Sequence, residues 1–194
     1  MSRYQDIYPS SPQASSQSID RTSVSDIFTL EYFEAEPAEM PIKKFDQHHI
    51  LINFKETPVR VENWRDGEHR DFIFNQNEIV VTPAGVTSGW KWYEKSKVIV
   101  VTLEPKNFED FALKELGLVL SSEQLRNTPQ FKDEDIANAA KFIYEAMESK
   151  DLGYLVLYES LSRIFLVKLK SMVKRKLKTI AIERALEQIN TKLF

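Results

Sequence analysis

Residues 78–92 read EIVVTPAGVTSGWKW, and the interpretation of the whole chain starts from this stretch. Valine and isoleucine dominate its first half, which is typical of a β-strand. Pro83 and Gly85 then predict a tight turn, after which a second strand begins. In that strand Trp90 and Trp92 are two residues apart, so both indoles lie on one face. That face either fills a packed core or lines an apolar pocket with one N–H group on each ring.

Similar short segments lie on both sides of this stretch, between residues 26 and 104. They are rich in β-branched and aromatic residues, and turn-forming segments such as KETP and RDGEH separate them. The predicted strands are IFTLEYF (27–33), HHILINF (48–54), PVRVENW (58–64), RDFIFN (70–75), EIVVTP (78–83), SGWKWY (88–93) and KVIVVTL (97–103). Short strands at this spacing predict an antiparallel sandwich or barrel.

The alternation within these strands predicts the inner wall of the barrel. Side chains two residues apart share a strand face, and a mainly apolar face is expected to point inward. The inward residues predicted in this way are His48, Ile50, Ile52 and Phe54, then Val59 and Val61, then Phe72 and Phe74. Ser88 lies on the same face as Trp90 and Trp92. We therefore predict that a small organic ligand binds near His48, Ser88, Trp90 and Trp92.

After Pro105 the hydrophobic period becomes helical. Asn107 can cap a first helix, and Gly117 is its predicted end. Two further helices are predicted within residues 133–148 and 153–173. The second carries a broad apolar stripe made of Tyr154, Leu157, Tyr158, Leu161, Ile164, Phe165, Leu169 and Met172. The predicted fold class is α+β, mainly β, with an antiparallel barrel over 26–104 and helices over 105–173.

The two ends of the chain have their own composition. Residues 1–25 are rich in Ser, Gln and Pro, which predicts a disordered arm; the alternative is an arm that folds over a ligand or partner. Near the other end, the basic segment KRKLKT (174–179) is interpreted as a solvated helix end or a linker. Beyond it, Ile182, Leu186, Ile189 and Leu193 have helical spacing, which predicts a short amphipathic helix that is marginal alone.

Composition excludes several classes of protein. The chain has 194 residues, 42% of them hydrophobic, with a formal net charge of −3 and a pI of about 5.7. Overall charge therefore gives no reason to expect nucleic-acid binding. The absence of cysteine excludes disulfides and thiolate metal sites. No apolar run approaches the length that spans a bilayer, and no secretory signal is present, so a cytoplasmic location is expected.

The histidines do not form a recognisable metal site. His48 and His49 are adjacent in a predicted strand, so their rings point to opposite faces and cannot both reach one ion. His69 lies in a turn-like stretch. His48 is expected to be a buried, hydrogen-bonded group or a polar group inside a ligand cavity. No nucleophile–base arrangement or glycine-rich phosphate loop is present, so neither a cofactor nor enzymatic activity is expected.

The order of these features resembles a known family. A strand pair with histidine, a DG turn, NEIVVTPAGVTSGWKW, a strand ending in LEP, and helices containing DEDIANAAKFI and LYESLSRIFLVKL follow one another. Over residues 27–194 this resembles the effector-sensing half of AraC-family transcription regulators. The resemblance implies a cupin-type barrel followed by dimerising helices. It also implies that part of the stripe Leu157, Leu161, Ile164 and Phe165 contacts a second copy or a full-length relative, the alternative being packing on the barrel.

The same resemblance bears on the end of the chain. RALEQINTKLF resembles the first helix of the family's DNA-binding half, so residues 174–194 are interpreted as a linker and the first helix of a missing domain. We therefore expect no sequence-specific DNA binding by this chain alone. The barrel also departs from metal-dependent cupins, since Ser88 stands where they have a histidine and HH replaces their HxH. A stand-alone cupin enzyme and a purely structural interaction module remain the alternatives.

Overall fold

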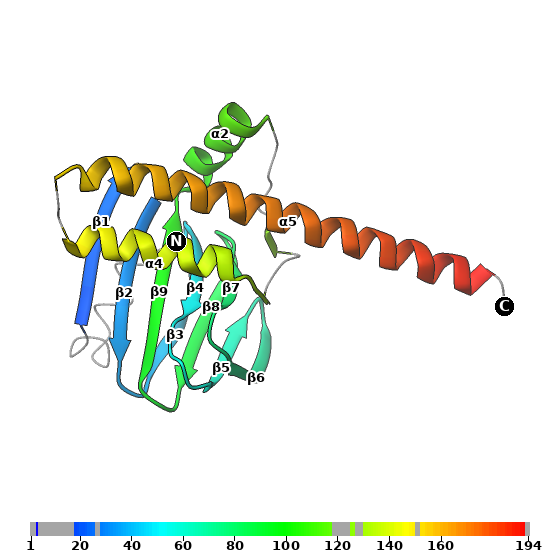
Figure 1. Cartoon of the computed structure of the whole chain (residues 1–194). Coiled ribbons are helices and arrows are strands. Elements are labelled where there is room, and N and C mark those ends of the chain that lie inside the picture. The colour runs from blue at the N-terminus through cyan, green and yellow to red at the C-terminus, as the bar shows by residue number, and fades with distance from the viewer. Residues whose placement is uncertain are drawn as a thin grey trace.

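The computed structural model describes residues 3, 18–25, 28–117, 125–126, 130–149 and 152–192. Within these residues the chain forms two antiparallel sheets that enclose a barrel interior, with helices outside the larger sheet (Figure 1). The larger sheet has the strand order β1-β2-β9-β4-β7-β10, and the smaller sheet has the order β3-β8-β5-β6. The strands are β1 (Ser18–Ser25), β2 (Phe28–Ala35), β3 (Ala38–Lys44), β4 (His48–Asn53), β5 (Val59–Arg65), β6 (Glu68–Phe74), β7 (Glu78–Thr82), β8 (Thr87–Trp92), β9 (Ser96–Leu103) and β10 (Gln130–Lys132).

The predicted turn after β7 carries the chain from one sheet to the other. β7 belongs to the larger sheet and β8 to the smaller one, and residues 83–86 join them. Gly85 has a φ of 81°, a left-handed conformation that side chains other than glycine rarely adopt. Its N–H donates to the Phe45 carbonyl at 2.8 Å. The turn is therefore anchored to the chain segment that leads into β4.

The central strands of the larger sheet are buried on both faces. In β4 every residue from His48 to Asn53 is buried. Ile50 and Ile52 pack against the helices, whereas Leu51 belongs to the cluster inside the barrel. The prediction that the face of Ile50 and Ile52 points into the barrel is therefore wrong. Because both faces of this strand are buried, the more apolar face need not be the one inside the barrel, and here the face with His49 and Asn53 points inward instead.

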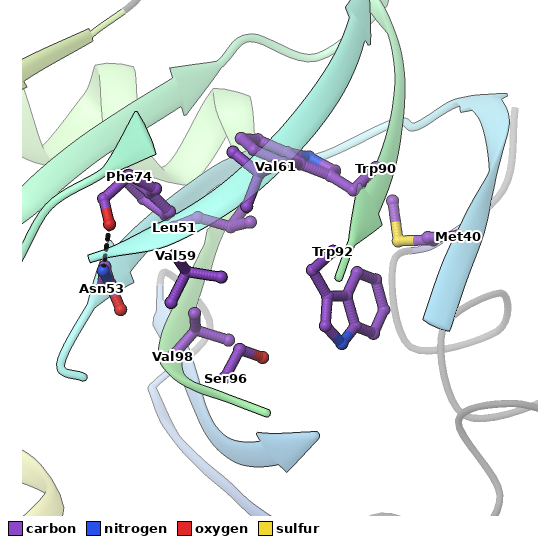
Figure 2. A pocket seen from close by; sticks show the side chains of 10 residues that line it. All are labelled: Met40, Leu51, Asn53, Val59, Val61, Phe74, Trp90, Trp92, Ser96 and Val98. Carbon is purple, nitrogen blue, oxygen red and sulfur yellow. Dashed lines mark hydrogen bonds between the residues drawn. The ribbon is translucent and has the colours of Figure 1, made fainter. Parts of the chain in front are cut away.

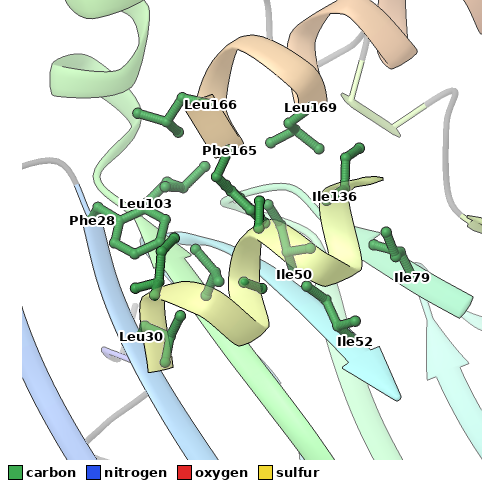
Figure 3. Close-up of a cluster of buried hydrophobic side chains, with 14 of the residues drawn as sticks. Phe28, Leu30, Ile50, Ile52, Ile79, Leu103, Ile136, Phe165, Leu166 and Leu169 are labelled. Carbon is green, nitrogen blue, oxygen red and sulfur yellow. The ribbon is translucent and has the colours of Figure 1, made fainter. Parts of the chain in front are cut away.

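The helices cover the outer face of the larger sheet. α2 (Pro105–Leu116) follows β9 directly, and α4 (Glu134–Ser149) and α5 (Tyr154–Lys192) lie side by side across the strands (Figure 1). Figure 3 shows Phe165 and Leu169 of α5 and Ile136 of α4 above the sheet. Phe165 meets Phe28 edge-on, with ring centroids 5.6 Å apart. Burial of this apolar layer is the main contribution of the helices to stability.

α5 continues without a break from Tyr154 to Lys192. Of the two interpretations of 174–179, the helix agrees with the structure, and the linker followed by a separate helix is wrong. Lys, Arg and Leu are good helix formers, and the segment contains neither Gly nor Pro, so its charges are compatible with a helix. Arg175 is 3.4 Å from Asp133, which also ties the start of this basic segment to the residue preceding α4.

Part of the predicted disordered arm is a strand. Ser18–Ser25 forms β1 and pairs antiparallel with β2 at the edge of the larger sheet. Apart from Arg3, whose guanidinium is 2.7 Å from Glu104, the remainder of residues 1–17 lies outside the described residues. Ile182 is the first residue of the apolar face predicted near the end of the chain, and its side chain is exposed. The described part of the chain does not include Leu193 or the side chains of Leu186 and Ile189.

Within the described part of the chain, no helix combines the length and the apolar composition that crossing a bilayer requires.

Gly89 in β8 is required by a close approach of β3. A Cβ atom at this position would lie 2.7 Å from Cγ1 and 3.0 Å from Cα of Ile42. We expect Gly89→Ala to lower the free energy of unfolding by about 1–3 kcal/mol, the usual range for overpacking. Ile42→Ala in the same chain should restore about half of this loss, because it removes the nearest atom. Urea unfolding of the two single variants and the double variant measures the coupling between residues 42 and 89. If the two changes in the free energy of unfolding simply add in the double variant, the proposed contact is contradicted.

Candidate functional site

A pocket opens into one end of the barrel, between the two sheets (Figure 2). Its volume is about 40 Å³. Its wall is mainly apolar and includes Met40, Leu51, Val61, Phe74, Trp90 and Trp92. Small-molecule sites are usually concave and mainly apolar, as this pocket is, although most of them are several times larger. The pocket is therefore the candidate functional site of this chain.

Both predicted tryptophans lie at this pocket. Trp90 and Trp92 share one face of β8, and that face points into the barrel, as the alternation predicted. Trp90 stacks on Phe74, with ring centroids 6.1 Å apart and the planes at 26°. The Trp92 indole donates its N–H to the Glu36 carbonyl at 2.6 Å. The tryptophans thus belong to the packed cluster and also line the pocket, and ligand binding by them stays a prediction.

Asn53 closes one side of the pocket through contacts with the backbone. Its Nδ2 donates to the Phe74 carbonyl at 2.8 Å, and its Oδ1 accepts a hydrogen bond from the Lys55 N–H at 3.0 Å. The buried amide therefore links the end of β4 to the end of β6. Sequence analysis did not single out Asn53. A lone Asn at the end of an apolar strand, just before a turn, was the available signal.

Polar side chains occupy another part of the barrel interior. His49 lies opposite Thr82 and Thr102 in the larger sheet, and Ser88 lies opposite Arg65 in the smaller one. The histidine, both threonines and the serine are buried. Ser88 therefore points inward as predicted, but it is not part of the pocket lining.

His48 lies on the other face of β4, outside the barrel. Its Nδ1 accepts a hydrogen bond from the Ala84 N–H at 3.0 Å, and its ring meets Phe108 edge-on at 6.0 Å. The predicted place of His48 beside the tryptophans is therefore wrong, because its face packs toward the helices. Its role is to hold the turn after β7. The histidine inside the barrel is its neighbour His49, which sequence reasoning had not chosen.

Burial keeps both imidazoles neutral near pH 7. Removal from water lowers the pKa of His48 to about 4. Burial also lowers the pKa of His49 to about 3, and the charges of His48 and Arg65 act in the same direction. A ligand site whose pH dependence centres near 6.5 therefore cannot come from His48. Among the described residues, no cluster of three or more His, Asp or Glu side chains could hold a metal ion.

The predicted dimerisation residues divide into two groups. Phe165 is fully buried in the core between helix and sheet, so its assignment to a dimer contact is wrong. Leu161 is partly buried against the same core. Leu157 and Ile164 are 51% and 46% exposed. At helical spacing, Leu157, Leu161 and Ile164 form one line along α5, which we call the outer stripe.

Comparisons with known proteins support the fold. No family model matches the sequence, and a search of the curated proteins finds no match. The AraC-like transcriptional activator CuxR has a TM-score of 0.55 at 9% identity, covering 83% of this chain and 57% of that chain. KdgF from Halomonas sp. has a TM-score of 0.38 at 15% identity, covering 44% of this chain and 76% of its own. The Cnp3 cupin domain of Schizosaccharomyces pombe has a TM-score of 0.40 at 13% identity, covering 53% and 72%.

These likenesses concern the fold alone. The chain has an antiparallel, cupin-like β-barrel followed by C-terminal helices, and this confirms the predicted fold class. It spans little more than half the length of CuxR.

The two depressed histidine pKa values predict a loss of stability in mild acid. Between pH 6.5 and the folded pKa, the unfolded chain binds protons that the folded chain does not, so the free energy of unfolding falls as pH falls. From pH 7 to pH 5 we expect a loss of about 2 kcal/mol per histidine. The pKa values of Glu34 and Asp71 are also lowered. These two carboxylates change the free energy of unfolding only at lower pH, below their ordinary pKa values of 4.5 and 3.8.

Urea unfolding at several pH values between 7 and 5 measures this loss. His48→Gln and His49→Gln should each reduce the pH dependence by about half, whatever their stability at pH 7. If the free energy of unfolding of the double variant depends on pH as in the parent chain, groups other than His48 and His49 cause the loss of stability.

Proposed function

We propose that this chain is the ligand-sensing and dimerising part of an AraC-type transcription regulator and is not an enzyme. The observation that carries the proposal is the apolar, tryptophan-lined pocket inside a barrel whose outer sheet face is covered by two long helices. In such a role the pocket receives a small organic effector. The helices then present a surface to a second copy.

The likeness to CuxR supports this proposal at the level of architecture. It covers 83% of this chain, a share that exceeds the barrel alone and includes helical residues. CuxR is an AraC-like transcriptional activator, so a protein of similar architecture is known to act in transcription. The proposal assigns no contact with DNA to the described residues. The absence of sequence-specific DNA binding by this chain stays a prediction.

The outer stripe supports association with a second copy. Leu157 and Ile164 expose about half of their surface, although Phe165 beside them is fully buried. Apolar side chains in line on an exposed helix face form a contact with another helix when one is available. We propose a homodimer through α5, and a heterodimer with a full-length relative would use the same face.

A stand-alone cupin enzyme is the rival function. Such an enzyme needs a metal or an acid–base pair that reaches its substrate. The described lining of the pocket contains no carboxylate and no imidazole, and this favours a binding role. Elemental analysis of the protein purified without chelators distinguishes the two functions, because a stoichiometric transition metal would favour the enzyme.

The effector site can be tested by tryptophan fluorescence against a metabolite library. Trp90→Phe and Trp92→Phe should each weaken binding of any hit by at least about threefold, because each removes part of an aromatic contact. Trp64→Phe is the matched control, since Trp64 stacks on His69 outside the pocket lining. If hits bind equally well to all three variants, the ligand site lies elsewhere.

Association can be tested by a charge placed on the outer stripe. Leu157→Glu and Ile164→Glu should each weaken the dimer by more than about tenfold, because a carboxylate would be buried at its centre. Leu155→Glu is a matched control, since Leu155 is 53% exposed and lies on another face of α5. Sedimentation at micromolar concentration measures the effect. A monomeric parent chain would contradict the homodimer.

A further inference from the structure

The polar groups that line the pocket are largely engaged with the protein itself. Asn53 uses its amide nitrogen and its oxygen in hydrogen bonds to the backbone. Trp92 gives its indole N–H to the Glu36 carbonyl. A sugar or another ligand with many hydroxyl groups would need several free partners here, since a buried polar group without one is costly. The other polar groups of the lining are the Ser96 hydroxyl and the Trp90 indole N–H, which are too few for such a ligand.

Charge is also kept away from the pocket. Among the described lining residues none carries a charge. Lys97 follows the lining residue Ser96, and its Nζ is 3.1 Å from Glu34, so the charge of this neighbouring residue is already compensated. Glu31 and His49 are buried inside the barrel but are not part of the lining. An anion or a cation in the pocket would therefore lose its hydration without gaining a counter-charge.

What the pocket does offer is aromatic and aliphatic surface. Trp90, Trp92 and Phe74 of the smaller sheet bring three rings to one space, and the larger sheet contributes Leu51 and Val98 to the same lining (Figure 2). The Trp90 Nε1 is buried and has no hydrogen-bond partner among the described residues. A ligand with one acceptor oxygen could satisfy this N–H.

We propose that the effector is a small, uncharged, mainly apolar molecule built around a single ring, with one hydrogen-bonding oxygen at most. This inference rests on the proposed sensor function and specifies its ligand. The pocket of about 40 Å³ has room for roughly three water molecules, so a ring enters only if lining side chains move. Met40 at the edge of the pocket is the flexible side chain that can make room.

The test uses three probes of one shape and different charge: benzyl alcohol, benzoate and benzylammonium, with glucose as a polar probe. The indole N–H signals of the three tryptophans are followed by ¹⁵N-edited NMR on the whole chain at pH 7. Benzyl alcohol is expected to shift the signals of Trp90 and Trp92 and to leave Trp64 unchanged. Its affinity should exceed that of either charged probe by at least about tenfold, because a charge would be buried unpaired.

A filled pocket provides the second measurement. Val98→Phe places a ring in the pocket and should abolish the shifts caused by benzyl alcohol, whereas Ile73→Phe, at an exposed position of β6, should not. Tighter binding of benzoate, benzylammonium or glucose at Trp90 and Trp92 would overturn the ligand class and leave the sensor function standing. No response to any probe would also overturn it, while the metabolite screen decides the sensor function separately.

Discussion

The fold depends on one constraint, which is that the central strands of the larger sheet must be buried on both faces. β4 has no exposed residue, so it needs apolar partners above and below. The helices supply one partner layer through Phe165 and Leu169, and the smaller sheet supplies the other through residues such as Val61 and Phe74. Neither layer alone would keep the strand out of water. Barrel and helices are therefore one packing unit, even though sequence patterns describe them separately.

This two-sided burial also explains why neighbouring residues have different roles. His48 and His49 are adjacent, yet one holds the turn after β7 and the other lies among polar side chains inside the barrel. Burial lowers the pKa of both. The apolar pocket is separate from both rings, and its indoles come from the other sheet. A structural role for His48 and a binding role for Trp90 and Trp92 are therefore compatible.

The sequence predicted the features that local chemistry controls. Pro83 and Gly85 marked the turn, and the spacing of Trp90 and Trp92 placed both indoles inside the barrel. The side of β4 that faces the barrel was predicted wrongly, because its more apolar face, with Ile50 and Ile52, packs under the helices, whereas the face with Leu51 and Asn53 points into the barrel. Phe165 was misassigned for a similar reason, since helical spacing gives a face but not its partner. The continuity of α5 was missed because a run of charges resembles a linker as much as a solvated helix.

The length of α5 has a mechanical consequence. Its 39 residues make a rod of about 58 Å, at the usual rise of 1.5 Å per residue. The first half is fixed to the sheet by buried side chains such as Phe165 and Leu169, and the second half extends past the edge of the barrel (Figure 1). A rod held at one end amplifies rotation: a tilt of 10° at the fixed half displaces a point 30 Å further along by about 5 Å. Slight repacking beneath the helix is thereby converted into a movement as large as one helical turn at its far end.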